Sequence, residues 1–147
     1  MPRTDAITRL TPAQAAAQLL AAADETWTRQ FLQELEHRVR ADQLRHVMTR
    51  WRLSGGDVAR IFRVSRQAVA KWLASSPPAE REPQVADLVA ATEVLERYVR
   101  RERIAAVVRR PAPALGGHSL LQLAQQGRTA EVLDAVRTMV DLRRVQP

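Results

Sequence analysis

The sequence contains no cysteine among its 147 residues, and only 4% of them are aromatic. Without cysteine, this chain has no disulfide, thiolate metal ligand or cysteine nucleophile. Alanine, leucine, valine and arginine dominate instead, so the core must consist mainly of aliphatic side chains on helices. We therefore expect an all-α fold.

The sequence also lacks a long hydrophobic run. The longest one, from Ala13 to Ala23, is interrupted by Gln14 and Gln18 and is shorter than the ~20 residues that a membrane-spanning helix needs. Asp5 lies where a signal peptide carries positive charge, and the run that follows is rich in alanine rather than leucine. We expect a cytoplasmic protein with no membrane partner.

No pattern typical of a catalytic or metal site is present. His37 and His46 have no second histidine or acidic residue at metal-ligand spacing, and His118 stands alone beside glycines. Gly116 and Gly117 lack the preceding strand, third glycine and following lysine of a phosphate-binding loop. We predict no catalytic residue, no metal and no cofactor, and a protein that is not an enzyme.

Lysine is almost absent. Lys71 is the only one, so 22 of the 23 basic residues are arginines, and with 16 acidic residues the formal net charge is +7. This balance favours a polyanionic partner, because guanidinium groups pair bidentately with phosphate and with guanine. A genome rich in G and C also enriches arginine and alanine, so composition alone leaves this question open.

The positive charge is concentrated in one part of the chain. Residues 36–72 hold nine basic side chains against three acidic ones, whereas residues 73–96 hold one arginine and five acids. A second basic block follows at residues 97–110. If the protein binds DNA, we expect the footprint in the first block, because it coincides with the most motif-like part of the sequence.

The part of the chain before residue 53 is predicted to be helical. Thr11, Pro12 and Gln14 form a helix start, and that helix should run to about Ala23. An apolar stripe at helical spacing follows, and we interpret it as packing in a core or in a dimer. It consists of Trp27, Phe31, Leu32, Leu35 and Val39. Asp42 interrupts the stripe and is expected to cap a new helix that carries Leu44, Val47, Met48 and Trp51.

Residues 53–73 describe two short helices joined by a turn. The inner faces are predicted to consist of Val58, Ala59 and Phe62 in the first helix and of Val69, Trp72 and Leu73 in the second. Val64 fills the corner, and Ser65 caps the second helix. The second helix then presents Arg66, Gln67, Ala70 and Lys71 outward, where the first turn of a recognition helix meets base edges.

This segment resembles the helix-turn-helix of Xre-type regulators, in which a small residue is followed five positions on by an aliphatic residue, then serine, a valine and a tryptophan. Arg63 stands where such motifs usually place glycine, so it must adopt a left-handed conformation or reshape the turn. A short helix pair inside an ordinary bundle is the alternative, but it does not explain the exposed Ser-Arg-Gln followed by a lysine.

Side-chain chemistry assigns the candidate DNA contacts. Arg66 suits the O6 and N7 edge of guanine and Gln67 suits adenine, so these two are the candidates for specificity, with Ala70 on the same face. Ser65 both caps the helix and touches the DNA backbone. The predicted phosphate contacts, which position the helix, are Lys71, Arg50, Arg52, Arg60 and Arg63.

The carboxy-terminal half is also predicted to be helical. Ser75-Ser76-Pro77-Pro78 and Pro83 mark a break, and the apolar periodicity from Val85 to Val108 predicts one long helix or two in succession, ending at Pro111. Ser119 or a neighbour caps a short helix that Gly127 ends. A last helix is expected from about Thr129 to Leu142.

A second resemblance covers about Val107 to Asp141. Pro-x-Pro-Ala-Leu-Gly-Gly from Pro111, then a short leucine-rich helix, a glycine and a helix beginning near a Glu-Val-Leu, is similar to the toxin-binding domain of Xre/MbcA/ParS antitoxins. Ala112 and Leu120 stand where the family often has asparagine and proline. The resemblance implies an antitoxin of a type II system that neutralises a co-encoded toxin by direct binding and autoregulates its operon through operator DNA. Family toxins are commonly RES-domain enzymes that consume NAD. The toxin-interface candidates it implies are Leu115, Gly116, Gly117, His118, Ser119, Arg137, Arg143 and Arg144.

We accordingly divide the chain into four parts. These are an N-terminal helical segment at 1–41, the first candidate for dimer contacts; a helix-turn-helix region at 42–76; a linker at 77–83; and a toxin-binding domain at 84–147. The expected partners are operator DNA, a toxin and further copies of the chain, in a homodimer or higher homo-oligomer. Two alternatives stay open: a stand-alone regulator that uses its carboxy-terminal domain for dimerisation, and a helical adaptor that never touches DNA.

Overall fold

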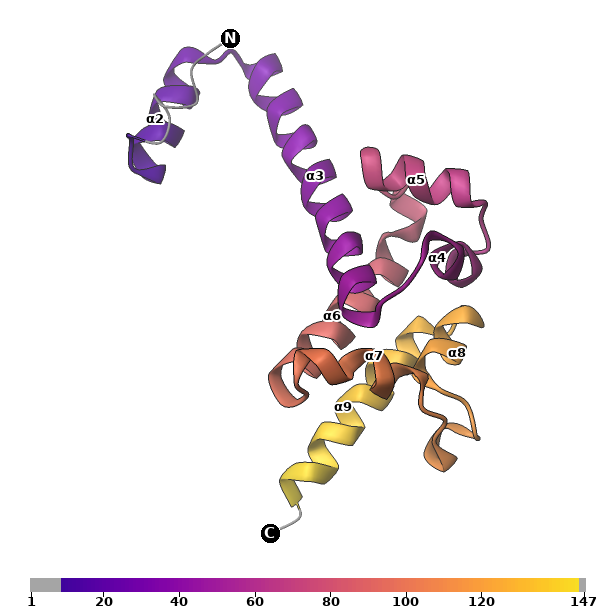
Figure 1. Ribbon diagram of the computed structural model, residues 1–147. Helices are drawn as coiled ribbons and strands as arrows, with labels where there is room; N and C mark the ends of the chain where they lie inside the picture. The colour runs from indigo at the N-terminus through magenta and orange to yellow at the C-terminus, as the bar shows by residue number, and fades with distance from the viewer. Residues whose placement is uncertain (1–8, 146–147) are drawn as a thin grey trace. The chain divides into compact units, whose positions relative to one another are not determined.

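The computed structural model describes residues 9–145, with side chains described as far as residue 143 (Figure 1). Within this range all regular structure is helical and there is no strand, so the expected all-α class is confirmed. The elements are α2 (Pro12–Ala22), α3 (Glu25–Trp51), α4 (Gly55–Phe62), α5 (Arg66–Ala74), the 3-10 turn η1 (Ala79–Arg81), α6 (Glu82–Tyr98), α7 (Arg101–Arg109), the 3-10 turn η2 (Pro113–Leu115), α8 (Leu120–Gln125) and α9 (Thr129–Val145). None of these helices is long and apolar enough to cross a membrane.

The chain forms two compact units, one ending at Glu36 and the other beginning at His37. The first contains α2 and the start of α3, and the second contains the rest of α3 and all the helices from α4 to α9. Residues on both sides of the predicted linker at 77–83 contribute to one continuous core, which runs from Leu44 to Val136.

The first unit is a helical hairpin held by local caps. Thr11 and Gln14 form the predicted capping box of α2, and Asp24 caps α3 by accepting a hydrogen bond of 2.7 Å from the Trp27 amide. The rings of Trp27 and Phe31 stack with their centroids 4.9 Å apart. No residue of α2 is buried. The apolar stripe stays exposed, so its interpretation as core is wrong within one copy of the chain, while dimer packing stays a prediction.

Helix α3 continues through Asp42, so the predicted break and new helix cap at this residue are wrong. Asp42 lies mid-helix and is exposed. Ala41, Leu44, Val47 and Trp51 form a buried stripe along the second part of the helix. An aspartate inside a helix costs a few tenths of a kcal/mol, whereas each large apolar side chain that is buried contributes ~1.5–3 kcal/mol, so packing decides the outcome.

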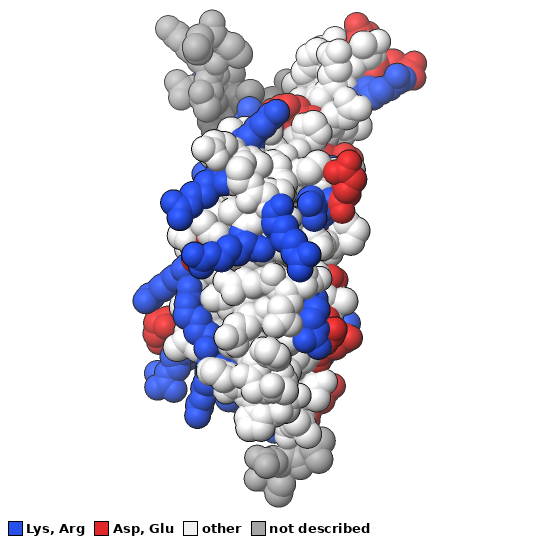
Figure 2. Space-filling model, turned by 90° about the vertical axis from the view of Figure 1, so that its right-hand side faces the viewer, with Lys and Arg blue, Asp and Glu red and all other residues white. Residues whose placement is uncertain are grey.

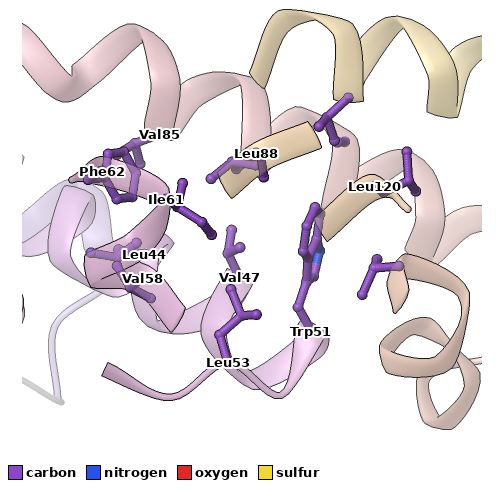
Figure 3. Close-up of a cluster of buried hydrophobic side chains, with 14 of the residues drawn as sticks. Leu44, Val47, Trp51, Leu53, Val58, Ile61, Phe62, Val85, Leu88 and Leu120 are labelled. Atoms are coloured by element: carbon purple, nitrogen blue, oxygen red, sulfur yellow. The ribbon is translucent and has the colours of Figure 1, made fainter. Parts of the chain in front are cut away.

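The core of the second unit is mainly aliphatic, as the composition predicts. Figure 3 shows Val47 and Trp51 of α3 among side chains of α4, α6 and α8, including Leu88 and Leu120. Phe62 and Trp72 meet edge to face, with their ring centroids 5.4 Å apart. Helix α6 packs along α9. Every buried polar side-chain atom among the described residues has a hydrogen-bond partner.

The helix ends predicted in the carboxy-terminal half are confirmed. The long apolar pattern forms two helices in succession, α6 and α7, separated at Val99 and Arg100. Ser119 caps α8 in a capping box with Gln122. Gly127 has a φ of 76° just after α8, which favours glycine. Helix α9 begins at Thr129 as expected and runs three residues beyond Leu142.

Candidate nucleic-acid and protein-binding surfaces

Helices α4 and α5 are joined by a short turn and pack against each other. Val58, Ala59, Phe62, Val69 and Trp72 are all buried, which confirms the predicted inner faces. Leu73 and Val64 are partly buried against the same core. Small Ala59 allows close approach of the two helices, as the predicted crossing requires.

The turn between α4 and α5 uses a left-handed arginine. Arg63 has φ 54° and ψ 49°, and the Val64 amide donates to the Ala59 carbonyl at 3.0 Å. Of the two predicted outcomes, a left-handed Arg63 or a reshaped turn, the structure has the left-handed Arg63. Arg52 has a φ of 52° after α3, with the Leu53 amide donating to the Met48 carbonyl at 2.8 Å. Arginine does not favour this conformation, so nothing in the sequence indicates the Arg52 turn.

A capping box that the sequence analysis missed begins α4. The Ser54 amide donates to Asp57 Oδ2 at 2.8 Å, and the Asp57 amide donates to Ser54 Oγ at 3.1 Å. The backbone hydrogen bond from Ser54 lowers the pKa of Asp57, with a smaller opposing effect of burial. The Ser-x-x-Asp spacing was the signal that could have revealed this cap.

The first turns of α5 present polar side chains to solvent. Ser65 Oγ accepts a hydrogen bond of 3.1 Å from the Ala68 amide, so the predicted cap is confirmed. Ser65, Arg66, Gln67, Ala70 and Lys71 are all exposed. Ser65, Arg66 and Gln67 are consecutive, and Ala70 and Lys71 follow one turn later, so these side chains form one surface along α5.

The Arg66 side chain folds back toward the start of α4. A β-carbon placed on Gly56 would lie 3.1 Å from Arg66 Nε, so a residue without a side chain leaves room for the guanidinium there. On the side seen in Figure 2, many Lys and Arg side chains are exposed to solvent. The side chain that the sequence analysis assigns to guanine is thus exposed, with its guanidinium held next to the first helix of the motif.

The predicted phosphate contacts fall into two environments. Arg52, Arg60, Arg63 and Lys71 are exposed, and Arg60 lies 3.8 Å from Asp57 Oδ1. Arg50 is different, because it is partly buried and its Nε forms an ion pair with Glu96 of α6. The structure therefore brings exposed basic residues together around α4 and α5, while Arg50 is engaged inside the fold.

Glu96 joins two side chains of α3. His46 Nε2 lies 3.0 Å from Glu96 Oε2, and Arg50 pairs with the other carboxylate oxygen. Burial raises the pKa of Glu96, but the hydrogen bonds from His46 and Arg50 outweigh it and hold the pKa below its ordinary value. The carboxylate therefore stays ionised and ties α6 to α3.

Two arginines that the sequence analysis did not single out hold the ends of the helix-turn-helix region. Arg45 donates to the carbonyl of Leu73, near the end of α5, at 2.6 Å. Arg109 of α7 donates to the carbonyls of Trp51 and Arg52 at 2.5 and 2.9 Å. Their partners lie 28 to 58 residues away in sequence, so no local pattern could reveal them.

The Pro/Gly segment after α7 forms a closed loop. The Ala112 amide donates to the His118 carbonyl, and the Gly117 amide donates to the Ala112 carbonyl, both at 3.1 Å. Gly116 and Gly117 have φ values of 66° and 83°, a conformation that favours glycine. The loop is held by its own backbone hydrogen bonds.

A hollow of about 360 Å³ lies between this loop and the start of α9. Its lining comprises Ala114, Leu115, Gly116, His118, Leu123, Arg128 and Glu131. Three predicted toxin-interface residues therefore share one concavity, and Gly117 is exposed beside it. Ser119 differs from them, because it is buried and its hydroxyl caps α8.

Arg128 and Glu131 supply the charge of the hollow. Arg128 Nε donates to Glu131 Oε1 at 2.8 Å, and this pairing lowers the pKa of Glu131 and raises that of Arg128. The sequence analysis missed both residues, although an Arg-x-x-Glu spacing at a helix start is the signal for such a pair. Arg137 and Arg143 are exposed on α9, and the side chain of Arg144 lies outside the described residues.

In the part of the chain that the structure describes, no group of three or more histidine, aspartate or glutamate residues is arranged to hold a metal ion.

No family model matches the sequence, and no curated protein matches it. One solved structure is similar: a chain in the crystal structure of the M. tuberculosis MbcT–MbcA toxin–antitoxin complex, with a TM-score of 0.56 and 20% sequence identity. The match covers 69% of this chain and 93% of that one. At this identity the likeness shows a shared fold.

Proposed function

We propose that this protein is an antitoxin that neutralises a toxin encoded beside it by direct binding and represses its own operon by binding DNA. The observation that carries the proposal is the fold shared with a chain of the MbcT–MbcA toxin–antitoxin complex, which extends over 93% of that chain. The exposed basic face of the helix-turn-helix and the preformed carboxy-terminal hollow support its two halves.

The toxin-binding half of the proposal uses the hollow beside the Pro/Gly loop. Leu115 offers an apolar contact, while Arg128 and Glu131 offer charges of both signs. A loop held by its own hydrogen bonds loses little entropy when a partner binds. The resemblance of this segment to the antitoxin family further implies a RES-domain toxin that consumes NAD.

Co-purification from the native host tests the toxin partner. A tagged copy is isolated under nuclease treatment, and the expected result is a small enzyme at near-stoichiometric yield whose expression alone depletes cellular NAD. Leu115→Glu should reduce the yield of that enzyme at least ~10-fold, because it places an extra charge in the hollow. Ala106→Glu, on an exposed residue of α7 outside the predicted toxin interface, is the control.

Recovery of the bait alone would overturn the antitoxin half of the proposal. The protein would then be a stand-alone DNA-binding regulator. A toxin that binds equally well to the wild type and to the Leu115→Glu variant would leave the antitoxin role standing and move the interface away from the hollow.

In the DNA-binding half of the proposal, the exposed residues fall into two groups according to which part of the DNA they contact. Arg66 and Gln67 read base edges, and phosphate contacts come from Arg52, Arg60, Arg63 and Lys71, with Ser65 touching the backbone. Ala70 lies between them and makes room for close approach to the groove. Arg50 is left out of this set, since its guanidinium already pairs with the Glu96 carboxylate. A homodimer would place two such helices on a palindromic operator.

Single substitutions separate specificity from affinity. Arg66→Ala should weaken operator binding by ~1–3 kcal/mol, with the loss confined to one base pair per half-site. Lys71→Ala should weaken operator and random DNA alike, and Arg137→Ala, exposed on α9, is the control. Fluorescence anisotropy with a set of operator variants measures this. Equal losses on specific and random DNA for Arg66→Ala would defeat its assignment to a base.

A further inference from the structure

The first unit exposes a continuous apolar surface. We call it the hairpin face and define it by Leu19, Leu20, Trp27, Phe31, Leu32 and Leu35, which are between 36% and 62% exposed. A groove of about 360 Å³ runs between α2 and α3, and five of these six residues line it. Around α3, steps of 100° per residue place Trp27, Phe31, Leu35 and Leu32 within one arc of ~140°. An arc of this width normally packs against a core.

Helix α2 has too little support of its own to be stable as a free surface helix. It contains 11 residues, none of them buried and none of them charged. Helices of this length are marginal in water unless an apolar face packs against something. The sequence of α2 is therefore that of a packed helix, although one copy of the chain leaves it uncovered.

The exposed area is more than half of what one partner contributes to a standard interface. With ~150–250 Å² for a whole aromatic side chain, the exposed parts of these six residues amount to on the order of 500 Å² per copy, against ~800 Å² per partner in a standard interface. The alanines of α2 and the rim of the groove add to this area. The stacked Trp27 and Phe31 rings provide the aromatic anchor at which binding energy concentrates.

The side-chain chemistry of the hairpin face indicates which kind of partner binds it. A membrane surface requires several lysines or arginines on the polar side of the helices; α2 has none, and Arg29, the one basic residue at 12–36, pairs with Glu25. A partner of opposite charge would find no charged side chain on the face to pair with. A second copy needs no complementary charge, because an isologous interface places the same apolar patch on both sides.

We propose that the hairpin face binds the hairpin face of a second copy, forming a two-fold dimer. Helix α2 has 11 residues, and the part of α3 in this unit, residues 25–36, has 12, so two hairpins can form a bundle of four helices each ~17 Å long. The argument rests on the proposed function only for the match between two-fold symmetry and a palindromic operator. Self-association is measured without DNA or toxin, so a failed dimer test is distinct from a failed test of DNA binding or of toxin binding.

The mass of the full chain in solution tests the dimer. The wild type should have twice the chain mass of 16.5 kDa. The double variant Leu20→Glu and Leu32→Glu should be monomeric, with self-association weakened more than ~100-fold, because it places four charges in the interface. Leu142→Glu should stay dimeric, since Leu142 is 65% exposed and lies outside the hairpin face. A monomeric wild type, or a double variant that remains dimeric, would overturn the proposal.

The absence of cysteine allows a second test that does not depend on a disruptive variant. A single Leu32→Cys chain should react with maleimide at least ~10-fold more slowly at high protein concentration than after dilution, because the dimer covers the thiol. Leu142→Cys should react equally fast at both concentrations. Equal rates at both concentrations for Leu32→Cys would contradict the dimer even if the double glutamate variant failed to fold.

Discussion

Thr92 joins two of the largest helices through one buried hydroxyl. Its Oγ1 accepts a hydrogen bond of 2.9 Å from Trp51 Nε1 and donates one of 2.7 Å to the Leu88 carbonyl. All of these groups lie in the core, where an unpaired donor has no water to bond with. The hydroxyl therefore fixes how the indole of α3 lies against α6.

Thr92→Val should lower the free energy of unfolding by ~1–3 kcal/mol, because it keeps the shape of the side chain but leaves the Trp51 indole N–H without an acceptor. Thr92→Ser is the control, since it keeps the hydroxyl and removes only a methyl group. Urea unfolding of the two variants measures the difference. A valine variant as stable as the serine variant would show that the hydrogen bond contributes nothing net.

Arg63 makes the opposite kind of contribution to stability. It holds a left-handed conformation that costs an L-residue ~1–2 kcal/mol. Arg63→Gly should raise the free energy of unfolding by ~0.5–1 kcal/mol after the larger entropy of glycine in the unfolded chain is counted. The same change at Arg60, inside α4, should instead destabilise by ~1 kcal/mol. Thermal unfolding of both variants gives the comparison, and changes of equal sign would contradict it.

If Arg63 also contacts a phosphate, the more stable glycine variant should bind DNA more weakly. Such an outcome would explain why an arginine stands at a turn whose backbone conformation favours glycine. The guanidinium would strengthen DNA binding, while the left-handed conformation makes the fold less stable. A glycine variant that is more stable and binds DNA as well as the wild type would remove Arg63 from the set of phosphate contacts.

At the scale of whole elements, α6 and α3 are connected by a carboxylate whose pKa is lowered. Burial opposes the shift, and the hydrogen bonds from His46 and Arg50 outweigh it. A group whose pKa is lower in the folded state contributes stability above its unfolded pKa and loses that contribution as the pH falls through its folded pKa. For Glu96 the contribution is complete well above 4.5 and is lost below that value.

Glu96→Gln should therefore be less stable than the wild type at pH 7, and the difference between them should shrink as the pH falls below about 4.5. Asp57 and Glu131 also have lowered pKa values, but they are present in both proteins and cancel in the comparison. Urea unfolding at a series of pH values measures the difference. A difference that is constant from pH 7 to pH 3 would show that the ionised form of Glu96 is not what stabilises the contact.

At the scale of the whole molecule, the net charge of +7 and the exposed basic residues in and around α4 and α5 predict DNA binding that depends steeply on salt. If the four exposed residues proposed to contact phosphate all do so, the slope of log affinity against log salt should be about −3.6 per copy, and about −7 when two copies bind one operator. Lys71→Ala should reduce the magnitude by about 1 per copy. Fluorescence anisotropy titrations at salt concentrations from about 50 to about 300 mM measure this slope. A slope near zero would exclude phosphate contacts as the basis of binding.

The helix ends and the helix-turn-helix could be predicted from the sequence because the interactions that form them are local. Thr11, Ser65 and Ser119 each bond to an amide three residues away, and Gly127 ends α8 through its own backbone conformation. The candidate recognition side chains follow from the Ser65 cap, since a helix start determines which residues of the next two turns face outward. Their exposure, but not their function, could therefore be predicted.

Other features depend on partners far away in sequence. Helix α3 passes through Asp42 because its second part packs into a core built by later helices. Arg50 pairs with Glu96, 46 residues away, and Arg109 bonds carbonyls at the end of α3, so two members of the arginine-rich composition have structural partners. Ser119 caps α8 through a local hydrogen bond, whereas its burial depends on tertiary packing.

The sequence by itself determined the all-α class, the caps at Thr11, Ser65 and Ser119, and the outward residues of α5, because each of these follows from interactions within about one helical turn. The tertiary structure alone decided which apolar stripe is buried and which is left exposed, which arginines are engaged, and that the Pro/Gly loop and the start of α9 enclose one hollow. These outcomes follow from contacts between helices distant in sequence, where burial outweighs local propensity.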